Sequence, residues 1–299
     1  MSRLGVSIFG GLALLVIGCA LWLSAQRQLP RATLTGALVL PGFATGLNDV
    51  SEIRIARGDG TVATLRRLDS TEWQVVERSY RADLVKLRRL LLDCAALAVV
   101  EQKTRDPDNY PALGLDEPNH AEARGTLLEI RSGTSTRRLI IGRAGGSNTS
   151  FVRVPDQAGS VLATPQLTLN AQPASWLDHQ LFDLPPERIK SVTRKPAPAT
   201  LKKAQVPPPD PSFAGFGFDD VRATSASSGN AQLSIETKDG MIVELSAQTA
   251  TRGFITVSAH AREGAEPRVH REASELAART AGRQFELPDY RYSALFPAR

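Results

Sequence analysis

The side chains that most often bind metals or carry catalysis are few in this chain, and their spacing fits no catalytic pattern. No two of the four histidines have the HxxxH or HExxH spacing that places two imidazoles on one helix face, and no CxxC motif is present. The chain also lacks a P-loop, a GxSxG nucleophile elbow and a GxGxxG motif after a strand. The glycine-rich stretch 142–146 lies between two expected strands with no helix after it, so it indicates a turn rather than a phosphate cradle. The histidines are His120, His179, His260 and His270.

The remaining polar candidates fit structural roles, such as turns and core positions, better than catalytic or metal-binding ones. Asp219 and Asp220 are adjacent, and neighbouring residues of a strand point to opposite faces, so they are poorly placed for paired acid–base work. Asp106 and Asp108 flank a proline and indicate a turn, with a calcium site as the alternative. Cys94 lies among leucines and alanines, as a small buried residue does. We therefore expect no enzyme activity, no catalytic, cofactor-binding or metal-binding residues, and no cofactor.

One apolar segment is rich in phenylalanine. Phe213, Phe216 and Phe218 lie close together after the proline-rich stretch 195–211. As an exposed patch they would form a docking surface for a partner protein, because aromatic side chains often dominate interfaces. The alternative is that the chain re-enters the hydrophobic core here, which is the usual environment of phenylalanine.

The composition is that of a globular protein with a slight basic excess. The chain has 299 residues, a hydrophobic fraction of 42% and a net charge of +5. Its basic residues occur as scattered pairs without the aromatic residues of the usual nucleic-acid-binding modules, so we expect no nucleic-acid partner. A mild positive charge suits weak attraction to the anionic headgroups of a bilayer.

The first 25 residues have the features of a membrane-spanning segment. Residues 4–23 contain no charged side chain and have about the 20 residues that a helix needs to cross a bilayer. Trp22 lies near one end of this run, where an indole ring is stable at the membrane interface. We expect residues 1–25 to be a transmembrane signal anchor and residues 26–48 to be a tether.

Two other processing routes stay open for this segment. A cleaved secretory signal would need small residues before the cut, but Leu23 lies two residues before Ala25. A lipoprotein signal would use the lipobox-like Val-Ile-Gly-Cys at 16–19 and acylate Cys19, although the apolar run continues beyond that cysteine. All three routes place the soluble body in the periplasm or otherwise outside the cytoplasm. We expect an inner (cytoplasmic) membrane protein that crosses the bilayer once.

After residue 49 the pattern changes to strands and one helix. Alternating apolar residues flank the hairpin turn at Asp59 and Gly60. Trp73 opens a further strand and is expected to be buried, as is Trp176. Asp83 is placed to cap a helix that runs to about residue 100. Apolar residues recur at helical spacing along this helix and are expected to pack on a sheet: Leu84, Leu87, Leu91, Cys94 and Ala98.

The second half of the chain repeats this arrangement loosely. A new first strand is expected at Ile189, a hairpin turn at residues 239–240, and a helix over residues 272–282 that ends at glycine. The predicted fold class is α+β. Its two degenerate repeats, residues 49–186 and 187–299, are each an antiparallel β-meander backed by a helix.

These elements occur in an order that is typical of one protein family. They are Trp73 after a hairpin, the helix headed by Asp83, Gly-Leu-Asp-Glu-Pro at 114–118, Leu-Ile-Ile-Gly at 139–142, Trp-Leu-Asp at 176–178 and Pro-Asp-Tyr at 288–290. Most of the chain after about residue 49 thereby resembles the domain-of-unknown-function family 4340. The chain departs from the family where the segment 195–211 stands in place of a second hydrophobic helix.

The resemblance implies a bacterial envelope protein with an N-terminal span and an extracytoplasmic body. Such proteins often accompany gliding-motility-type ABC transport components, namely an ATPase, a multi-span permease and an auxiliary subunit. We therefore expect a non-catalytic, membrane-anchored accessory subunit of an envelope ABC-type transport or gliding-motility-like assembly. Its partners would be the bilayer, the permease and the auxiliary envelope subunit. The alternatives are a free-standing envelope binding module for glycan or lipid, and an unrecognised hydrolase.

Overall fold

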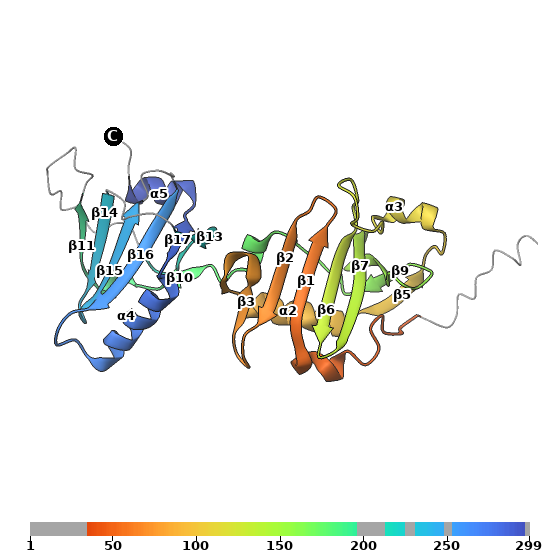
Figure 1. The fold of residues 1–299 in the computed structure, drawn as a ribbon, viewed down its shortest axis with the longest axis horizontal. Coiled ribbons are helices and arrows are strands. Elements are labelled where there is room, and N and C mark those ends of the chain that lie inside the picture. Colours follow the sequence, from red (N-terminus) through yellow and green to blue (C-terminus); the bar gives the residue numbers. More distant parts are fainter. Residues whose placement is uncertain (1–34, 196–212, 225–230, 248–252, 297–299) are drawn as a thin grey trace, which may run out of the picture.

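The protein has an α+β fold made mostly of antiparallel sheets with few helices (Figure 1). The computed structural model describes residues 35–195, 213–224, 231–247 and 253–296. Within them the strands form a nine-stranded sheet, a six-stranded sheet and a two-stranded ribbon. The α+β prediction is confirmed at this level.

The nine-stranded sheet forms the N-terminal part of the described chain. Its strand order is β4-β3-β2-β1-β6-β7-β8-β9-β5, so most neighbours along the chain pair in space, and β5 returns to the far edge beside β9. In that order the strands span Tyr80–Arg81, Trp73–Val75, Val62–Arg67, Val50–Arg57, Thr126–Ser132, Ser135–Gly146, Thr149–Arg153, Val161–Thr164 and Ala98–Gln102.

The first hairpin forms where the sequence predicts it. Strands β1 and β2 pair antiparallel around a turn in which Gly60 has a φ of +84°, a conformation that favours glycine. The Asp59 carboxylate accepts a hydrogen bond from the Thr61 amide at 2.9 Å, which closes the turn. The inward side chains Ile53, Ile55 and Leu65 are completely buried, as the alternating pattern requires.

Helix α2 (Leu84–Ala95) begins at the predicted cap and ends earlier than predicted. The Asp83 carboxylate accepts hydrogen bonds from the amides of residues 85 and 86 at 2.9 and 3.0 Å. Of the predicted apolar face, Leu87, Leu91 and Cys94 are buried and Leu84 is half-buried, whereas Ala98 lies beyond the helix in β5. The prediction that the helix reaches residue 100 is wrong, because residues 98–102 form β5 and pair with β9.

The six-stranded sheet follows, with strand order β11-β14-β15-β16-β17-β13. In that order the strands span Ile189–Lys195, Ala231–Thr237, Met241–Ala247, Phe254–Ala261, Arg283–Glu286 and Asp220–Ala223. Helix α4 (Pro267–Thr280) packs against β15 and β16, and α5 (Asp289–Leu295) closes the described chain. Helix α4 starts before the predicted residue 272, because proline is well suited to the first helical turn, where its missing N–H is not needed.

The short helices are η1 (Ala44–Asp49), η2 (Val76–Arg78), η3 (Pro107–Asn109), α3 (Tyr110–Leu113), η4 (Pro173–Trp176) and η5 (Pro186–Arg188).

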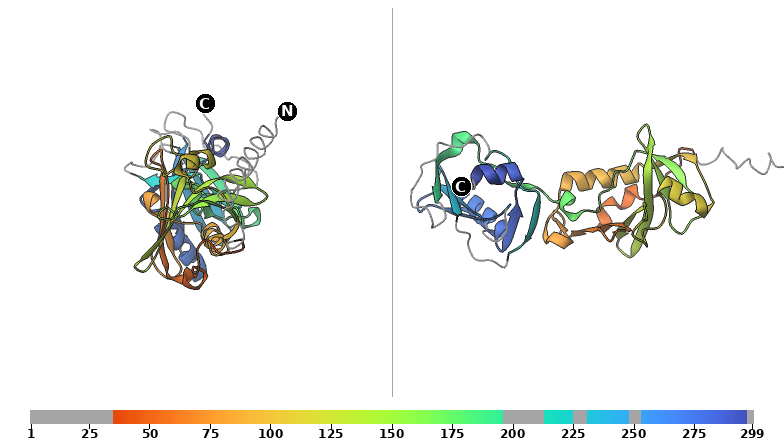
Figure 2. Two further views of the ribbon diagram at one scale, coloured as in Figure 1. Left: turned by 90° about the vertical axis from the view of Figure 1, so that its right-hand side faces the viewer. Right: turned by 90° about the horizontal axis from the view of Figure 1, so that it is seen from above.

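The two sheets meet at a narrow junction (Figures 1 and 2). The two-stranded ribbon, β10 (Gln180–Phe182) with β12 (Phe216–Gly217), belongs to this junction. The Tyr80 ring meets the rings of Phe218 and Phe285 edge-on, with centroids 5.4 and 5.8 Å apart, so one aromatic cluster joins residues of both sheets. Trp73 and Trp176 are 6% and 2% exposed, which confirms that both are buried.

The predicted membrane span is not part of this description. No helix within the described ranges is long and apolar enough to cross a bilayer. The expected span at residues 4–23, Cys19 within it and almost all of the stretch 195–211 lie outside the described residues.

Candidate functional site

The phenylalanine segment does not form an exposed patch. Phe213, Phe216 and Phe218 are 1%, 0% and 2% exposed, so the prediction of a docking surface on these side chains is wrong. The Phe216 ring stacks on the Phe182 ring of β10 with centroids 4.6 Å apart. The physical reason is the pairing of β12 with β10, which turns the three rings into the core, as the alternative interpretation held.

The other polar candidates have structural partners. Asp220 forms an ion pair with Arg78 at 2.6 Å, so the carboxylates at 219 and 220 do not act as a pair. The Asp106 carboxylate accepts a hydrogen bond from the Asp108 amide at 3.1 Å, which confirms the predicted turn. Burial, followed by the negative charge of the neighbouring Asp93, raises the pKa of the Cys94 thiol to about 12. This thiol is therefore protonated and unreactive at neutral pH.

Histidines do not build a site either. The ring nitrogen Nδ1 of His179 lies 2.7 Å from the carbonyl oxygen of Phe218, a contact that holds the ring at the junction. Across the described ranges, no three His, Cys, Asp or Glu side chains gather as a metal site would require.

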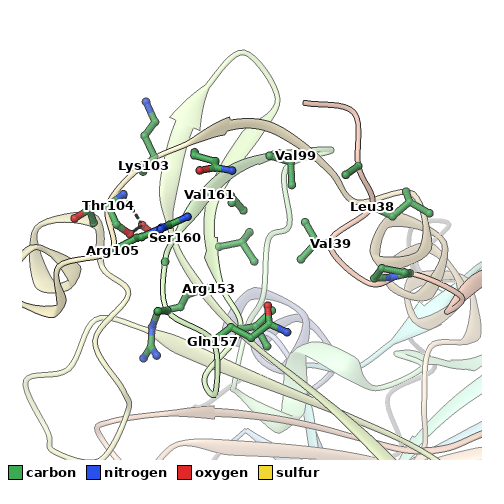
Figure 3. Close-up of a pocket in the computed structure, with 17 residues that line it drawn as sticks. Leu38, Val39, Val99, Lys103, Thr104, Arg105, Arg153, Gln157, Ser160 and Val161 are labelled. Atoms are coloured by element: carbon green, nitrogen blue, oxygen red, sulfur yellow. Dashed lines mark hydrogen bonds between the residues drawn. The ribbon is translucent and has the colours of Figure 1, made fainter. Parts of the chain in front are cut away.

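A cavity of about 290 Å³ opens at the end of the nine-stranded sheet where the described chain begins (Figure 3). We call it the N-terminal pocket. Three segments line it: residues 37–41, the end of β5 with residues 103–105, and the end of β8 with the chain leading into β9. Figure 3 shows apolar side chains on one side of the pocket and polar ones on the other. The lining side chains labelled there are Leu38, Val39, Val99, Lys103, Thr104, Arg105, Arg153, Gln157, Ser160 and Val161.

The apolar side of the pocket exists because the first described residues extend the sheet. The amide of Gly36 donates to the carbonyl of Val99 at 2.7 Å, and the amide of Val99 donates to the carbonyl of Ala37 at 2.8 Å. The amide of Val39 donates to the carbonyl of Leu97 at 2.8 Å. These bonds cover the open edge of β5, which would otherwise expose unpaired backbone groups. They also fix the side chains of residues 38 and 39 at the pocket.

Hydrogen bonds to the backbone hold the polar side of the pocket. The Ser160 hydroxyl donates to the Thr104 carbonyl at 3.0 Å and accepts a hydrogen bond from the Thr104 amide at 3.2 Å. The Gly159 amide donates to the Tyr110 hydroxyl at 3.2 Å. The Ser160 hydroxyl is therefore engaged by backbone groups, and no histidine or carboxylate lines the pocket beside it to act as a base.

Three cations and no carboxylates line the N-terminal pocket. Lys103 forms an ion pair with Glu101 at 2.7 Å. Arg153 is 6% exposed, lies over the Tyr110 ring at 4.7 Å and reaches Glu117 at 3.3 Å. Arg105 forms no ion pair with any described residue. An apolar wall facing a cationic rim suits an elongated ligand with an apolar part and an anionic or hydroxyl-bearing end.

The sequence gives no signal for this pocket. Lys103, Thr104 and Arg105 form a short basic stretch like many others in the chain. The return of β5 to the edge of the sheet brings these residues beside residues 153–161. Only this long-range pairing makes them the rim of a cavity.

Of the comparisons with known proteins, one with family models found a match and those with curated proteins and solved structures found none. Residues 73–212 match the family model described as Domain of unknown function (DUF4340). The matched region runs from the start of β3 past the end of β11 and contains most of the lining of the N-terminal pocket. No curated protein and no solved structure matches the chain. This match confirms the predicted resemblance to the DUF4340 family over a little less than half of the chain.

Proposed function

We propose that this chain is a non-catalytic, membrane-anchored accessory subunit of an envelope ABC-type transport or gliding-motility-like assembly. The observation that carries the proposal is the attachment of residues 36–39 to the edge of β5. The chain that leads to the apolar run at 4–23 therefore leaves the body at the end that holds the N-terminal pocket. Residues 24–34 span at most about 40 Å even when fully extended.

The proposal includes the expected topology and repeat structure. The apolar run would cross the inner membrane once, with the body in the periplasm or otherwise outside the cytoplasm. The two repeats would be the two sheets with their helices, and the presence of α2 beside the first sheet and α4 on the second supports this division. Tethering raises the effective concentration of the body near other membrane proteins, so that a modest interface is enough for a complex.

The test is photo-cross-linking from the two ends of the full-length chain in its native membrane. A cross-linking amino acid would replace Gln157 at the exposed rim of the pocket or, as the matched control, Tyr290, which is 72% exposed on α5 in the other sheet region. We expect Gln157 to cross-link to a multi-span permease and Tyr290 to give no such product. The proposal fails if a mild-detergent extract contains neither an ATPase nor a permease bound to the chain.

A second candidate function is a free-standing envelope binding module for a lipid-like ligand. The specific observation in its favour is the apolar wall of the N-terminal pocket facing Arg105, a cation with no ion pair to any described residue. Decanoate, which has one carboxylate and an apolar chain, is a suitable probe for the full-length chain held in amphipol. Binding of decanoate should weaken severalfold in Arg105→Gln and stay unchanged in Arg66→Gln, whose exposed ion pair with Glu52 lies elsewhere on the sheet.

A further inference from the structure

A second cavity, of about 310 Å³, lies at the junction between the two sheets. We call it the junction cleft. The nine-stranded sheet contributes residues of β3, β4 and the turn between them, and the six-stranded region contributes the end of α4 and the start of β17. Figure 1 shows this junction as the narrow connection between the two sheets. The lining residues are Glu72, Gln74, Ser79, Tyr80, Arg81, Ala278, Arg279 and Arg283.

Two of the three arginines in the cleft have no carboxylate partner. Arg279 donates to the carbonyl of Leu181, and Arg283 donates to the carbonyls of Arg279 and Ser79 at 3.1 and 3.0 Å. Neither forms an ion pair within 4.0 Å with any residue in the described ranges. Carbonyl oxygens satisfy the hydrogen-bonding of a guanidinium group, but they do not neutralise its charge.

The third arginine, Arg81, has a carboxylate partner. Arg81 forms an ion pair with Asp178 at 3.0 Å and donates to the carbonyl of Gln180 at 2.9 Å. Burial, followed by the positive charge of Arg81, lowers the pKa of Arg279. Asp178 and Glu275 act on Arg279 in the opposite direction and do not compensate these two effects. A guanidinium group stays protonated in proteins, so the cleft keeps its excess of positive charge.

Three buried hydrogen-bond donors next to the cleft lack acceptors among the described residues. Tyr80 is 3% exposed, and its hydroxyl has no hydrogen-bond partner among the described residues. The same holds for the buried Nε atoms of Arg81 and Arg279. Buried donors without acceptors are rare in folded proteins, because losing their contact with water is costly. Because these atoms lie below the surface of the cleft, it is the uncompensated charge of Arg279 and Arg283 that favours an anion there.

We propose that the junction cleft binds an oxyanion of the phosphate type, held by the guanidinium groups of Arg81, Arg279 and Arg283. The forked donors of arginine match the oxygen atoms of phosphate and form charge-assisted hydrogen bonds with them. The anion joins the two sheet regions, because Arg81 belongs to β4, whereas Arg279 lies in α4 and Arg283 begins β17. Free phosphate and a phosphate group on an envelope molecule share this chemistry. The inference is independent of the proposed accessory function.

Glu72 provides a distinctive internal check. It is an exposed carboxylate at the edge of the cleft, and it repels an incoming anion. Glu72→Gln should therefore strengthen phosphate binding, whereas Arg279→Gln and Arg283→Gln should weaken it. A site built for a cation would respond in the opposite direction to all three substitutions.

The experiment is isothermal titration of the full-length chain in detergent with inorganic phosphate, against chloride at the same ionic strength. We expect saturable binding that falls at least tenfold in Arg279→Gln and in Arg283→Gln and rises in Glu72→Gln. A matched control should bind as the original chain does: Arg268→Gln removes an exposed arginine of α4 that pairs with Glu266.

A parallel titration with glycerol 3-phosphate separates the two sources of the anion. Tighter binding of glycerol 3-phosphate assigns the cleft to a phosphate group on a larger molecule, and tighter binding of inorganic phosphate assigns it to the free ion. The proposal is overturned if neither compound binds, or if a folded Arg279→Gln chain binds phosphate unchanged. If both glutamine variants fail to fold, Glu72→Gln decides, and unchanged affinity in that variant overturns the proposal.

Discussion

The two large sheets hold their helices by different means. Helix α2 packs through apolar side chains, and its internal ion pair between Arg89 and Asp93 lies toward solvent, with the arginine side chain 76% exposed. Helix α4 also buries an apolar face, but its Glu272 carboxylate binds Arg188 through two hydrogen bonds of 2.7 and 2.6 Å. Arg188 in turn binds Asp239 at 3.0 Å.

The ion network at α4 has a defined geometry, which the apolar packing of α2 lacks. Arg188 lies in η5, Asp239 lies in the turn between β14 and β15, and Glu272 lies in α4, so one guanidinium group joins three separate segments. Apolar burial stabilises a helix without fixing its direction, whereas a bidentate ion pair has a defined geometry.

The largest expected effect tests the apolar half of this comparison. Trp73→Ala should lower the free energy of unfolding by about 3–5 kcal/mol, because it removes a large buried side chain and leaves a cavity. Urea denaturation of the full-length chain measures this loss. A loss below about 1 kcal/mol would mean that the nine-stranded sheet does not depend on its core in this way.

The next effect tests the ion network of the second sheet. Arg188→Ala should cost about 1.5–3 kcal/mol, the usual range for hydrogen bonds to charged groups, because it leaves two partly buried carboxylates without their partner. The control is urea denaturation of Arg268→Ala. This variant removes only the exposed pair between Arg268 of α4 and Glu266, so its free energy of unfolding should change little. Equal losses in the two variants would show that the network has no special role.

The stability of the original chain should depend on pH more strongly than that of Asp239→Asn, in which the carboxylate of the ion network is replaced by a neutral amide. Burial alone would raise the pKa of Asp239, but hydrogen bonds from Thr237 and Arg188 outweigh it, and the pKa is lowered overall. A carboxylate with a lowered folded-state pKa contributes stability above its unfolded pKa of about 4, and this contribution is lost as the pH falls through the folded value. Thermal unfolding of Asp239→Asn should therefore show a smaller loss of stability in this acidic range than the original chain shows. Parallel curves would contradict the assignment.

The smallest expected effect completes the comparison on α2. Arg89→Ala should change the free energy of unfolding by only about 0.3–0.5 kcal/mol, because the pair with Asp93 is exposed and spaced i, i+4 on one helix. The same denaturation assay, repeated at high salt, should remove even this difference. A loss as large as that of Arg188→Ala would remove the distinction between the two helices.

Much of the fold was predictable because its signals are local. The Asp83 cap, the hairpin at Asp59 and Gly60 and the alternating strands depend on residues only a few positions apart. Helix ends were less predictable, since residues 97–100 fit a helix by periodicity and become a strand only because β9 and residues 36–39 pair with them. The candidate site was not predictable, because its rim joins residues more than 45 positions apart, such as Thr104 and Ser160.

The α+β class, the elements with strong local patterns, the burial of Trp73 and Trp176 and the family resemblance could all be predicted from the sequence. Tertiary structure alone decided that Phe213, Phe216 and Phe218 face the core, and that three arginines from both sheets meet at one cleft. The physical reason is the range of the interactions. Caps, turns and periodicity are set by neighbours in the chain, whereas burial and the gathering of charge depend on which distant segments share a sheet or a junction.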